Sequence, residues 1–580
     1  MAEAAAEKKK SKPGWGTLAR SLKNPKSGYM ALFGFASGLP FALFLGTLYA
    51  WLSEAEVELE TMGVFSLIGL AYAFQFLWSP LIDKVSIPGF HRLGRRKQWI
   101  VPSQILLGVI LIALSLSNPT NEAIGWFSLL AGIGALASAT QDIAINAWRI
   151  DVADEEATLD ILSTVYQMGY RLAALVGGAL GLIIAARIGW PQTYLMMGAI
   201  LLVIGIAGLF APDGKAGENE DGEVTDDLLL SLRRKGEVKP EVRTKALAAV
   251  GLLWAVAIGT VLTFMYMSLA YPPEERPNPT EFTLTYGPWI IVATVVIPAF
   301  IAGWLASQKA KGLNVMTEDL PEREGGSFAL DHLYRALVMP LVEFVGRMGW
   351  SLVLILSLVL TYRICDAIWG TFAYPFYLGE LNYTNDEVAF ASKFFGVGAI
   401  IAGLAFGGYL LTVIGRMATL TLGALIAALT NLLYADMAIG GANMQAASDA
   451  IGFSWVISTI APFGSDALPR LTFTIMWENL AIGIAGAAYV AWLSSIVSKK
   501  YSAVQYALLS SLTLLVGTLG RGALGEMIEK QGYFDVFILT TLIGGIAVVL
   551  CVFEWIRETR SRRSGVVTPN AHDAAVQPAE

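Results

Sequence analysis

The segment AIGWFSLLAGIGALASATQDIAINAW, residues 123–148, decides the class of this chain, because it is a long apolar run with a single charged side chain, Asp142. A helix that spans the hydrocarbon of a bilayer needs roughly 20 apolar residues. An ionisable residue inside the hydrocarbon is costly, so its presence indicates a function. The segment therefore predicts a transmembrane helix that carries a functional carboxylate.

Segments of this kind recur along the whole chain. Of its 580 residues, 55% are hydrophobic and only 15% are charged, whereas about a quarter are charged in soluble proteins. The segments lack the alternation of membrane-barrel strands, so helices are expected. About fourteen spans are predicted, at 29–52, 61–82, 98–116, 123–148, 160–186, 191–211, 244–270, 286–306, 350–378, 388–414, 416–436, 469–497, 502–525 and 533–556.

The grouping of the spans predicts an all-α polytopic membrane protein with two six-helix bundles and an inserted helix pair, an arrangement typical of transporters. The predicted parts are a lead (1–28), a first bundle (29–211), a linker (212–243), the inserted pair (244–306), a polar segment (307–347), a second bundle (348–556) and a polar tail (557–580). A further insert at 437–468 either lies on the membrane surface or covers the outer mouth.

Charge sorting predicts the orientation, since basic residues mark the cytoplasmic side. Alternate connections are basic, at 84–97, 233–235, 499–500 and 557–563, and the connections between them are acidic, at 54–60, 274–275 and 380–387. We expect both termini, the linker and the 307–347 segment to be cytoplasmic. The first helix is too long for a signal peptide core, so it is expected to be retained.

Asp142 is the first candidate for a proton-binding group. The three histidines, His91, His332 and His572, lie in predicted loops or the tail, so a carboxylate has to take the proton if the protein is proton-coupled. Arg171 lies at a similar predicted depth on the next helix. It could pair with Asp142 and bind an anionic substrate group once Asp142 is protonated, or the pair could simply pin two helices together.

Two further carboxylates are candidates for the same role. Glu478 lies about a third of the way into its predicted span, and Asp366 lies three residues after Arg363 on one helix face. Trp369 and Tyr374 follow on the helix of Asp366, and aromatic faces with hydrogen-bonding groups suit a sugar. The alternative is an aromatic belt with a self-neutralised ion pair.

Other polar side chains within the spans could donate hydrogen bonds to polar groups of a substrate. Each could equally serve as a helix–helix contact. These side chains are Gln75, Gln141, Asn146, Tyr166, Gln167 and Asn479. Cys365 and Cys551 have no metal-ligand spacing, so no metal site and no disulfide are predicted.

A gating function is predicted for the connection after the second span. Asp83 precedes Gly94-Arg95-Arg96, and a carboxylate at a helix end could hold this basic loop and latch the cytoplasmic face shut. An ordinary basic cytoplasmic loop is the alternative.

Several motifs together resemble the AmpG-type muropeptide permeases, a branch of the major facilitator superfamily in Gram-negative inner membranes. They are Gly34-Phe35-Ala36-Ser37-Gly38-Leu39-Pro40, Phe76-Leu77-Trp78-Ser79-Pro80-Leu81, Ala139-Thr140-Gln141-Asp142-Ile143 and Gly169-Tyr170-Arg171-Leu172. The resemblance is strongest over about 28–211 and continues more weakly to about 556. The long lead, the 307–347 segment and the tail depart from it.

The resemblance implies proton-coupled import of N-acetylglucosaminyl-1,6-anhydro-N-acetylmuramic acid and its peptide-bearing forms from periplasm to cytoplasm. It further implies a role in cell-wall recycling and β-lactamase induction, with protons as coupling ion and no bound cofactor. The expected protein is a monomer in the bilayer of the bacterial inner membrane, without nucleic-acid partners.

Two other functions stay open. The same fold could carry another sugar conjugate or an acyl-linked metabolite, or it could be a non-transporting membrane sensor. A membrane enzyme is not expected, because the sequence has no nucleotide-binding loop, no HExxH zinc signature and no nucleophile elbow.

Overall fold

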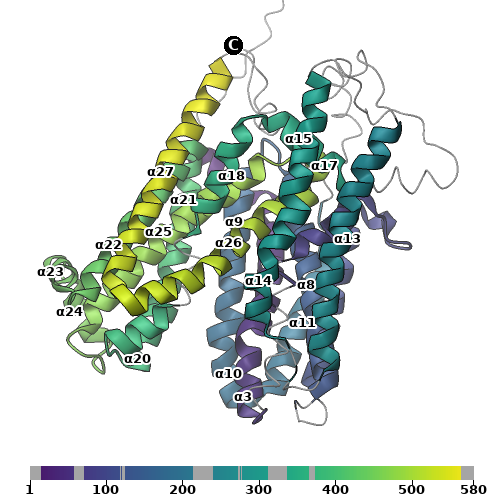
Figure 1. The fold of residues 1–580 in the computed structure, drawn as a ribbon. Helices are drawn as coiled ribbons and strands as arrows, with labels where there is room; N and C mark the ends of the chain where they lie inside the picture. Colours follow the sequence, from purple (N-terminus) through teal and green to yellow (C-terminus); the bar gives the residue numbers. More distant parts are fainter. Residues whose placement is uncertain are drawn as a thin grey trace, which may run out of the picture.

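The computed structural model describes residues 15–57, 69, 71–72, 74–117, 119, 124–212, 240–271, 275, 277–310, 336–364 and 372–563. These parts of the chain form long helices (Figure 1). Among the described residues, eleven helices are long and apolar enough to cross a membrane, or twelve if one bent pair counts as a single span. The predicted all-α polytopic class is confirmed.

The first half of the chain, residues 15–212, forms one bundle. Its helices are α1 (Trp15–Lys23), α2 (Pro25–Ala42), η1 (Leu43–Thr47), α3 (Leu48–Glu54), η3 (Gln75–Leu77), α6 (Ser79–Lys84), η4 (His91–Leu93), α7 (Lys97–Ser115), α8 (Ile124–Val152), α9 (Leu159–Leu175), η5 (Val176–Leu180), α10 (Gly181–Ile188) and α11 (Trp190–Gly208). Here η1 and η5 are π-helical turns, so α2 to α3 and α9 to α10 each make one continuous span.

Local sequence sets where these helices begin. The side chain of Asn24 caps α2 by accepting the N–H of Lys26, and Pro25 follows in the first turn. The Thr158 side chain caps α9 in the same way by accepting the N–H of Ile161. The predicted first span at 29–52 therefore starts earlier, at Pro25, and the predicted lead contains α1.

Small residues bring α2 and α9 into close contact. A Cβ atom on Gly34 or on Gly38 would collide with the backbone carbonyls of Tyr166 and Tyr170, respectively. The two glycines are four residues apart, the spacing that lets transmembrane helix backbones approach closely. This crossing sets the position of Ser37, which lies between them, against α9.

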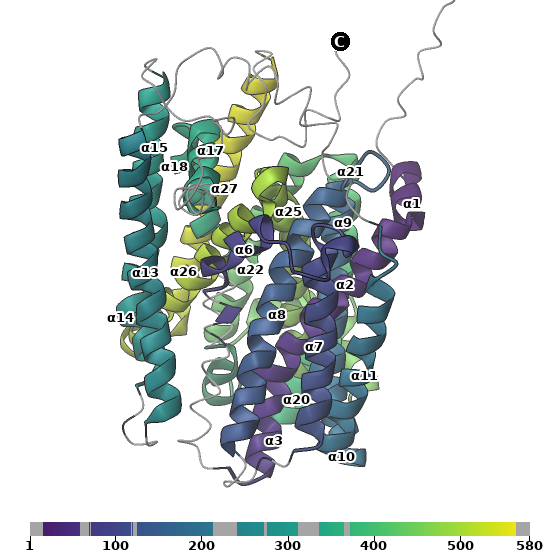
Figure 2. The same ribbon diagram turned by 90° about the vertical axis from the view of Figure 1, so that its right-hand side faces the viewer.

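A pair of long helices lies at one side of the molecule, next to α17 (Met339–Met348) and α26 (Ser502–Gln531) of the second half (Figure 2). It consists of α13 (Pro240–Ala270) and a second span made of α14 (Pro279–Ile291), the π-helical turn η7 (Val292–Val296) and α15 (Ile297–Ala310). Trp254 of α13 packs edge-on against Phe76, with ring centroids 6.3 Å apart. The predicted inserted pair at 244–306 corresponds to these helices.

The second half of the described chain, residues 336–563, forms the other bundle. Its helices are α17 (Met339–Met348), α18 (Ser351–Thr361), η8 (Pro375–Glu380), α20 (Asn385–Ala389), η9 (Phe390–Gly396), α21 (Val397–Val413), α22 (Arg416–Ala438), α23 (Ala442–Ala450), α24 (Phe453–Ile460), α25 (Leu468–Ser495), η10 (Lys499–Tyr501), α26 (Ser502–Gln531) and α27 (Tyr533–Arg563). Of these, η8 and η9 are π-helical turns.

The predicted continuous span at 350–378 stays a prediction, because residues 365–371 lie outside the described part of the chain. Helix α18 ends at Thr361, and residues 375–380 form a π-helical turn. At its other end, α18 meets α17 at 105°, because Gly349 ends α17 in a positive-φ conformation (φ 53°). Helix α17 therefore does not extend α18 in a straight line.

The predicted count of about fourteen spans is not reached among the described residues. Three predicted spans are missing from the eleven. The spans at 61–82 and 350–378 lie partly outside the described residues. The span at 502–525 corresponds to the 30-residue helix α26, in which the side chains of residues 514–523 are not described.

The insert predicted at 437–468 contains α23 and α24. It is tied to the second half by Glu387, whose Oε1 accepts the N–H of Ser465 at 2.7 Å. Asp436 accepts the N–H of Met444 at 2.9 Å. These hydrogen bonds, together with that from Asn443 Nδ2 to Asp436 at 2.6 Å, hold the insert against the helix ends from which it emerges.

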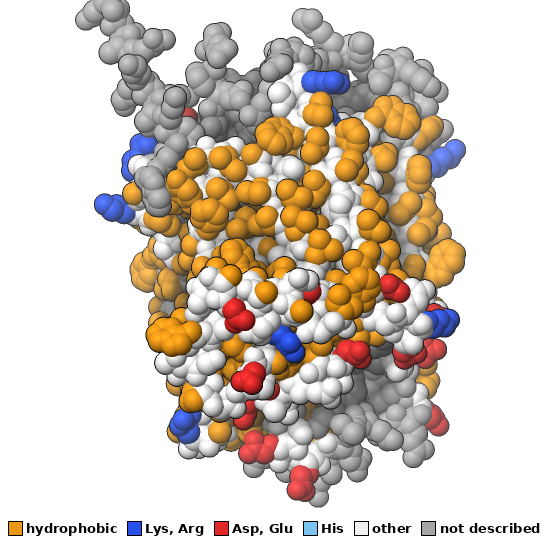
Figure 3. Space-filling model, turned by 90° about the vertical axis from the view of Figure 1, so that its left-hand side faces the viewer, with side chains coloured by type: hydrophobic (Ala, Val, Ile, Leu, Met, Phe, Trp, Pro, Cys, Tyr) orange, Lys and Arg blue, Asp and Glu red, His pale blue; other side chains and the backbone are white. Residues whose placement is uncertain are grey.

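The two ends of the molecule differ in charge. The basic end carries Arg95, Arg96, Arg416, Lys499 and Lys500, and the acidic end carries Glu54, Glu380, Asp386, Asp449 and Asp466. Figure 3 shows hydrophobic side chains over most of one face, with acidic side chains gathered below them. Figure 1 shows the halves meeting toward the basic end and diverging toward the acidic end.

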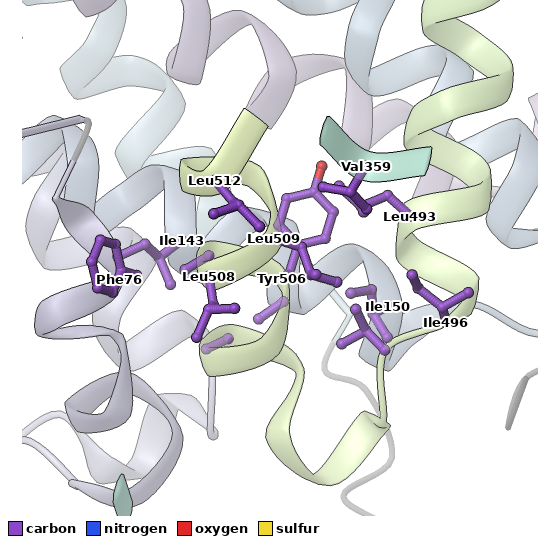
Figure 4. Packing of buried hydrophobic residues seen from close by; sticks show 14 of the residues in the cluster. Phe76, Ile143, Ile150, Val359, Leu493, Ile496, Tyr506, Leu508, Leu509 and Leu512 are labelled. Carbon is purple, nitrogen blue, oxygen red and sulfur yellow. The ribbon is translucent and has the colours of Figure 1, made fainter. Parts of the chain in front are cut away.

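The largest hydrophobic core joins the two halves. Figure 4 shows Ile143 of α8 near Leu508 of α26, and Ile150 of α8 near Ile496, which follows α25. Each of these side chains is at least nine-tenths buried. Packed interiors exclude water, so this core seals the interface between the halves below the basic end.

Candidate functional site

Helix α8 places Asp142 inside the bundle, ten residues before its end at Val152. The hydroxyl of Tyr166 donates to Asp142 Oδ1 at 2.7 Å, and the hydroxyl of Ser37 donates to the same oxygen. The two hydroxyls are 3.1 Å apart. Three helices, α2, α8 and α9, therefore meet at one carboxylate. We call Ser37, Asp142 and Tyr166 the inner cluster.

Aromatic side chains stand next to the inner cluster. The Phe41 ring packs edge-on against Tyr72 at 5.1 Å and tilted against Tyr170 at 6.0 Å. The Tyr166 and Tyr170 rings are 6.2 Å apart. A carboxylate beside several aromatic faces is an arrangement that suits an amphiphilic sugar, whose ring has an apolar face and a polar rim.

Both predicted substrate-binding arginines lie near this cluster. The Tyr170 hydroxyl is within electrostatic range of Asp142, Arg171 and Arg363. Arg363 comes from the second half and is also within range of Tyr489. A carboxylate and two guanidinium groups, one of them from the second half, thus contribute to the electrostatic environment of one hydroxyl. Whether Arg171 pairs with Asp142, as predicted, stays a prediction.

Glu478 forms a second carboxylate–tyrosine cluster, in the other half. The Tyr434 hydroxyl donates to Glu478 Oε2, and it lies 2.8 Å from the Tyr377 hydroxyl. We call these three residues the outer cluster, because Glu478 lies ten residues from the acidic-end start of α25. An open apolar pocket of about 390 Å³ on another face of α25 is lined in part by Phe394 and Trp477.

The inner and outer clusters therefore lie at different depths. At 1.5 Å per residue, Asp142 is about 15 Å from the basic end of α8, and Glu478 is about 15 Å from the acidic end of α25. Each carboxylate accepts a hydrogen bond from a tyrosine. The chain thus holds one such carboxylate toward each face.

The other predicted substrate-binding residues differ in their surroundings. Gln141 donates from Nε2 to the carbonyl of Ala36 at 2.7 Å and is fully buried, so its amide joins α8 to α2. Asn146 and Asn479 each donate to the carbonyl four residues earlier.

Three candidates remain. Gln75 is 4% exposed, and its Oε1 has no partner among the described residues. Gln167 is half-buried. Tyr374 is exposed, with Lys393 Nζ 5.9 Å from its ring centroid. Asp366 and Trp369 lie outside the described residues.

The predicted latch residues do come together. Arg96 pairs with Asp83 at 2.8 Å and with Asp151 at 2.6 Å, and Arg95 lies 3.3 Å from Asp83. Burial works against the charged form of Arg96, but Asp151 and Asp83 outweigh it and raise the pKa of the guanidinium above its ordinary value. The side chains of Asp83 and Arg96 are almost completely buried.

This network reaches across to the second half. Asp83 accepts the backbone N–H groups of Ala503 and Val504, at the start of α26. Anions are stabilised at a helix N-terminus by its free N–H groups and its dipole. Arg95 donates to the carbonyl of Lys500 at 2.7 Å, and Ser502 accepts from Arg96 and donates to Asp151.

A second ion pair joins the halves nearby. Arg416 Nε donates to Asp160 Oδ1 at 2.8 Å, between α22 and α9. A Cβ atom on Gly408 would come within 2.7 Å of the Thr164 side chain, so α21 and α9 also approach closely here. The basic end is therefore closed. The gating function of Asp83, Arg95 and Arg96 stays a prediction.

Arg149 was missed by the sequence reasoning. It is fully buried on α8, and its Nη2 donates to Ser494 Oγ of α25 at 2.9 Å. The predicted span ended at Trp148, so Arg149 resembled an ordinary charge at the membrane boundary. A signal was available, because Arg149 is seven residues after Asp142 and shares its helix face.

The fold and these sites define a polytopic membrane protein whose two halves close around a polar centre. A model of the Major Facilitator Superfamily matches residues 27–317. The chain belongs to this superfamily.

Individual proteins give a more specific comparison than the superfamily. The chain is 28% identical over 547 residues to the "Anhydromuropeptide permease" of Escherichia coli (strain K12), covering 93% of this chain and 82% of that protein. It is 24% identical over 524 residues to the "Putative transporter AmpG 4" of Rickettsia felis, covering 90% and 94%.

A solved structure supports the fold alone. The chain resembles a double tryptophan mutant of XylE with a TM-score of 0.50 and 12% identity, over 91% of this chain and 94% of that chain.

Proposed function

We propose that this chain is a secondary transporter that imports peptidoglycan turnover products together with protons. The cargo is N-acetylglucosaminyl-1,6-anhydro-N-acetylmuramic acid and its peptide-bearing forms. The similarity to an anhydromuropeptide permease over 93% of the chain supports this cargo. The protein acts as a carrier and not as an enzyme, so the cargo leaves unaltered.

Asp142 carries the coupling in this proposal. Asp142 accepts hydrogen bonds from Ser37 and Tyr166 at the point where three helices meet. An ionisable carboxylate inside the membrane-spanning part of a protein is costly and commonly belongs to a proton path. Glu478 is the second carboxylate on this path.

The cargo site lies between the halves. Arg171 and Arg363 are near the Tyr170 hydroxyl, and a guanidinium suits the lactyl or peptide carboxylate of a muropeptide. The rings of Phe41, Tyr72 and Tyr170 offer apolar faces to the sugars. Alternating access then exposes this site to each face in turn.

The basic end is the cytoplasmic end in this proposal, since basic residues favour that side. Both termini are then cytoplasmic in the bacterial inner membrane, and the closed basic end corresponds to a state that faces the periplasm. The transporter works as a monomer without a bound cofactor. Its cargo feeds cell-wall recycling and, through it, β-lactamase induction.

The test is uptake of labelled disaccharide into proteoliposomes with and without an inward proton gradient. Wild type accumulates cargo only with the gradient. Asp142→Asn keeps the hydrogen-bonding shape but cannot titrate, so we expect it to lose accumulation and to retain exchange of labelled for unlabelled cargo. Asp466→Asn, which neutralises an exposed carboxylate at the acidic end, is the matched control. Normal accumulation by Asp142→Asn would refute the coupling role.

A further inference from the structure

Arg149 is a buried cation that the proposed mechanism does not yet use. Its side chain is fully buried, and Ser494 Oγ accepts from Nη2 at 2.9 Å. Its Nε and Nη1 atoms have no hydrogen-bond acceptor in the described part of the chain. A buried charge normally has a partner of opposite charge. Two of the three guanidinium nitrogens are therefore available to an anion.

Two aromatic rings hold the guanidinium in the closed state. Its central carbon lies 4.8 Å from the ring centroid of Tyr166 and 5.1 Å from that of Tyr506. Such cation–π contacts compensate in part for lost hydration. Tyr166 belongs to the first half, whereas Tyr506 and Ser494 belong to the second. Half of this enclosure therefore depends on the halves being together.

The position of Arg149 places it between the inner cluster and the latch. It lies about 10 Å beyond Asp142 along α8, at 1.5 Å per residue. Asp151, two residues further on, belongs to the latch through Arg96 and Ser502. Arg149 therefore lies on the side of the inner cluster from which cargo would leave toward the basic end.

We propose that Arg149 binds the carboxylate of the cargo in the state that is open at the basic end. This inference rests on the proposed function and adds a second anion site to it. When the halves separate at this end, Tyr506 and Ser494 withdraw with the second half, and the guanidinium becomes accessible. A carboxylate then supplies the missing acceptors on Nε and Nη1.

Tyr166 links this site to proton coupling. Its ring faces Arg149, and its hydroxyl donates to Asp142. When an anion arrives at Arg149, the electrostatic environment of Tyr166 and Asp142 changes without direct contact. Carboxylate binding and the protonation of Asp142 are coupled through one side chain.

Counterflow from each face separately is the test. Inverted membrane vesicles present the basic end to the medium, and right-side-out vesicles present the acidic end. Two cargoes are compared: the disaccharide with its free lactyl carboxylate, and the same disaccharide with that carboxyl converted to a primary amide. At the basic end, we expect wild type to prefer the carboxylate roughly ten- to a hundredfold in half-saturation concentration, as is typical for hydrogen bonds to charged groups.

Arg149→Gln should bring this preference close to one at the basic end and leave it unchanged at the acidic end. Arg149→Lys should retain part of it, because the charge remains. Arg187→Gln removes an exposed guanidinium at the acidic end and should behave as wild type. An arginine that merely pins the halves together would change rates without changing the preference for carboxylate.

An unchanged preference at the basic end in Arg149→Gln overturns the inference, as does an equal loss at both ends. Wild type that transports neither cargo refutes the proposed function instead. If Arg149→Gln does not insert into the membrane, the wild-type protein alone tests the inference. Inverted vesicles are treated with phenylglyoxal, which modifies accessible arginine side chains. The peptide that contains Arg149 should be protected by the carboxylate cargo and not by the amide; equal modification with both cargoes refutes the proposal.

Discussion

Removing the charge of Asp83 should shift the protein toward the state that is open at the basic end. Asp83→Asn has nearly the same shape as wild type, so packing is retained. The change removes the ion pair with Arg96 at 2.8 Å and weakens the hydrogen bonds from the N–H groups of Ala503 and Val504. These N–H groups belong to the second half, so the loss falls on the closed state.

The size of the effect follows from these contacts. A charge at a helix N-terminus contributes up to about 2 kcal/mol when partly buried, and a hydrogen bond to a charged group exceeds one to a neutral group by about 1 kcal/mol. Arg96 keeps Asp151 at 2.6 Å, so the cost stays below the roughly 3–5 kcal/mol of a fully broken buried pair. We expect about 2–3 kcal/mol, or about a 30- to 150-fold change in population.

Double electron–electron resonance measures this population. Spin labels at Phe90 and Ile414, two exposed positions at the basic end of different halves, would be introduced after Cys365 and Cys551 are replaced by alanine. Wild type should show one short distance, and Asp83→Asn should add a longer one as the major component.

The matched control is Asp386→Asn, which removes an exposed carboxylate at the acidic end and should leave the distances unchanged. A distance distribution for Asp83→Asn that equals that of wild type would refute the reasoning. It would mean that the hydrophobic core between the halves, and not the charged network, closes this end.

Three further outcomes are expected. Tyr166→Phe removes a hydrogen bond to the inner carboxylate, so gradient-driven accumulation should fall roughly tenfold in a properly inserted protein, and unchanged accumulation contradicts this. Gly403→Ala places a Cβ atom against the backbone carbonyl of Leu480 and should lower the thermal midpoint in detergent by several degrees, whereas Gly398→Ala, which meets nothing within 4 Å, should not. Removing residues 564–580 should leave transport intact in a properly inserted protein, because this polar tail lacks core-forming residues.

The membrane class follows from the sequence because the length of an apolar run is a local property. Most predicted spans correspond to helices. The span predictions that did not match have local physical causes, which the average hydropathy of a segment does not record. Gly349 turns the chain by 105° between α17 and α18. This helix end could have been predicted, because a glycine after a basic final turn is a known signal for it.

The residues of the candidate site could be predicted from the sequence, but the contacts between them could not. Asp142 and Tyr166 were both candidates for the site, and the packing of α8 beside α9 makes them partners. Contacts such as Arg416 with Asp160 join residues 256 positions apart. No periodicity within one helix predicts them, because the arrangement of the two halves decides which side chains meet.

The π-helical turns are the positions at which the membrane-spanning helices of this protein can bend. Among the described spans, η1, η5, η8 and η9 lie toward the acidic end, and η7 lies near the middle of its span. A π turn has a wider hydrogen-bond spacing than an α-helix and often occurs at functional positions. The part of the molecule toward the acidic end therefore bends more easily than the part at the basic end, where the charged network joins the two halves. The acidic end can open when single helices bend, whereas the basic end opens only when the two bundles separate.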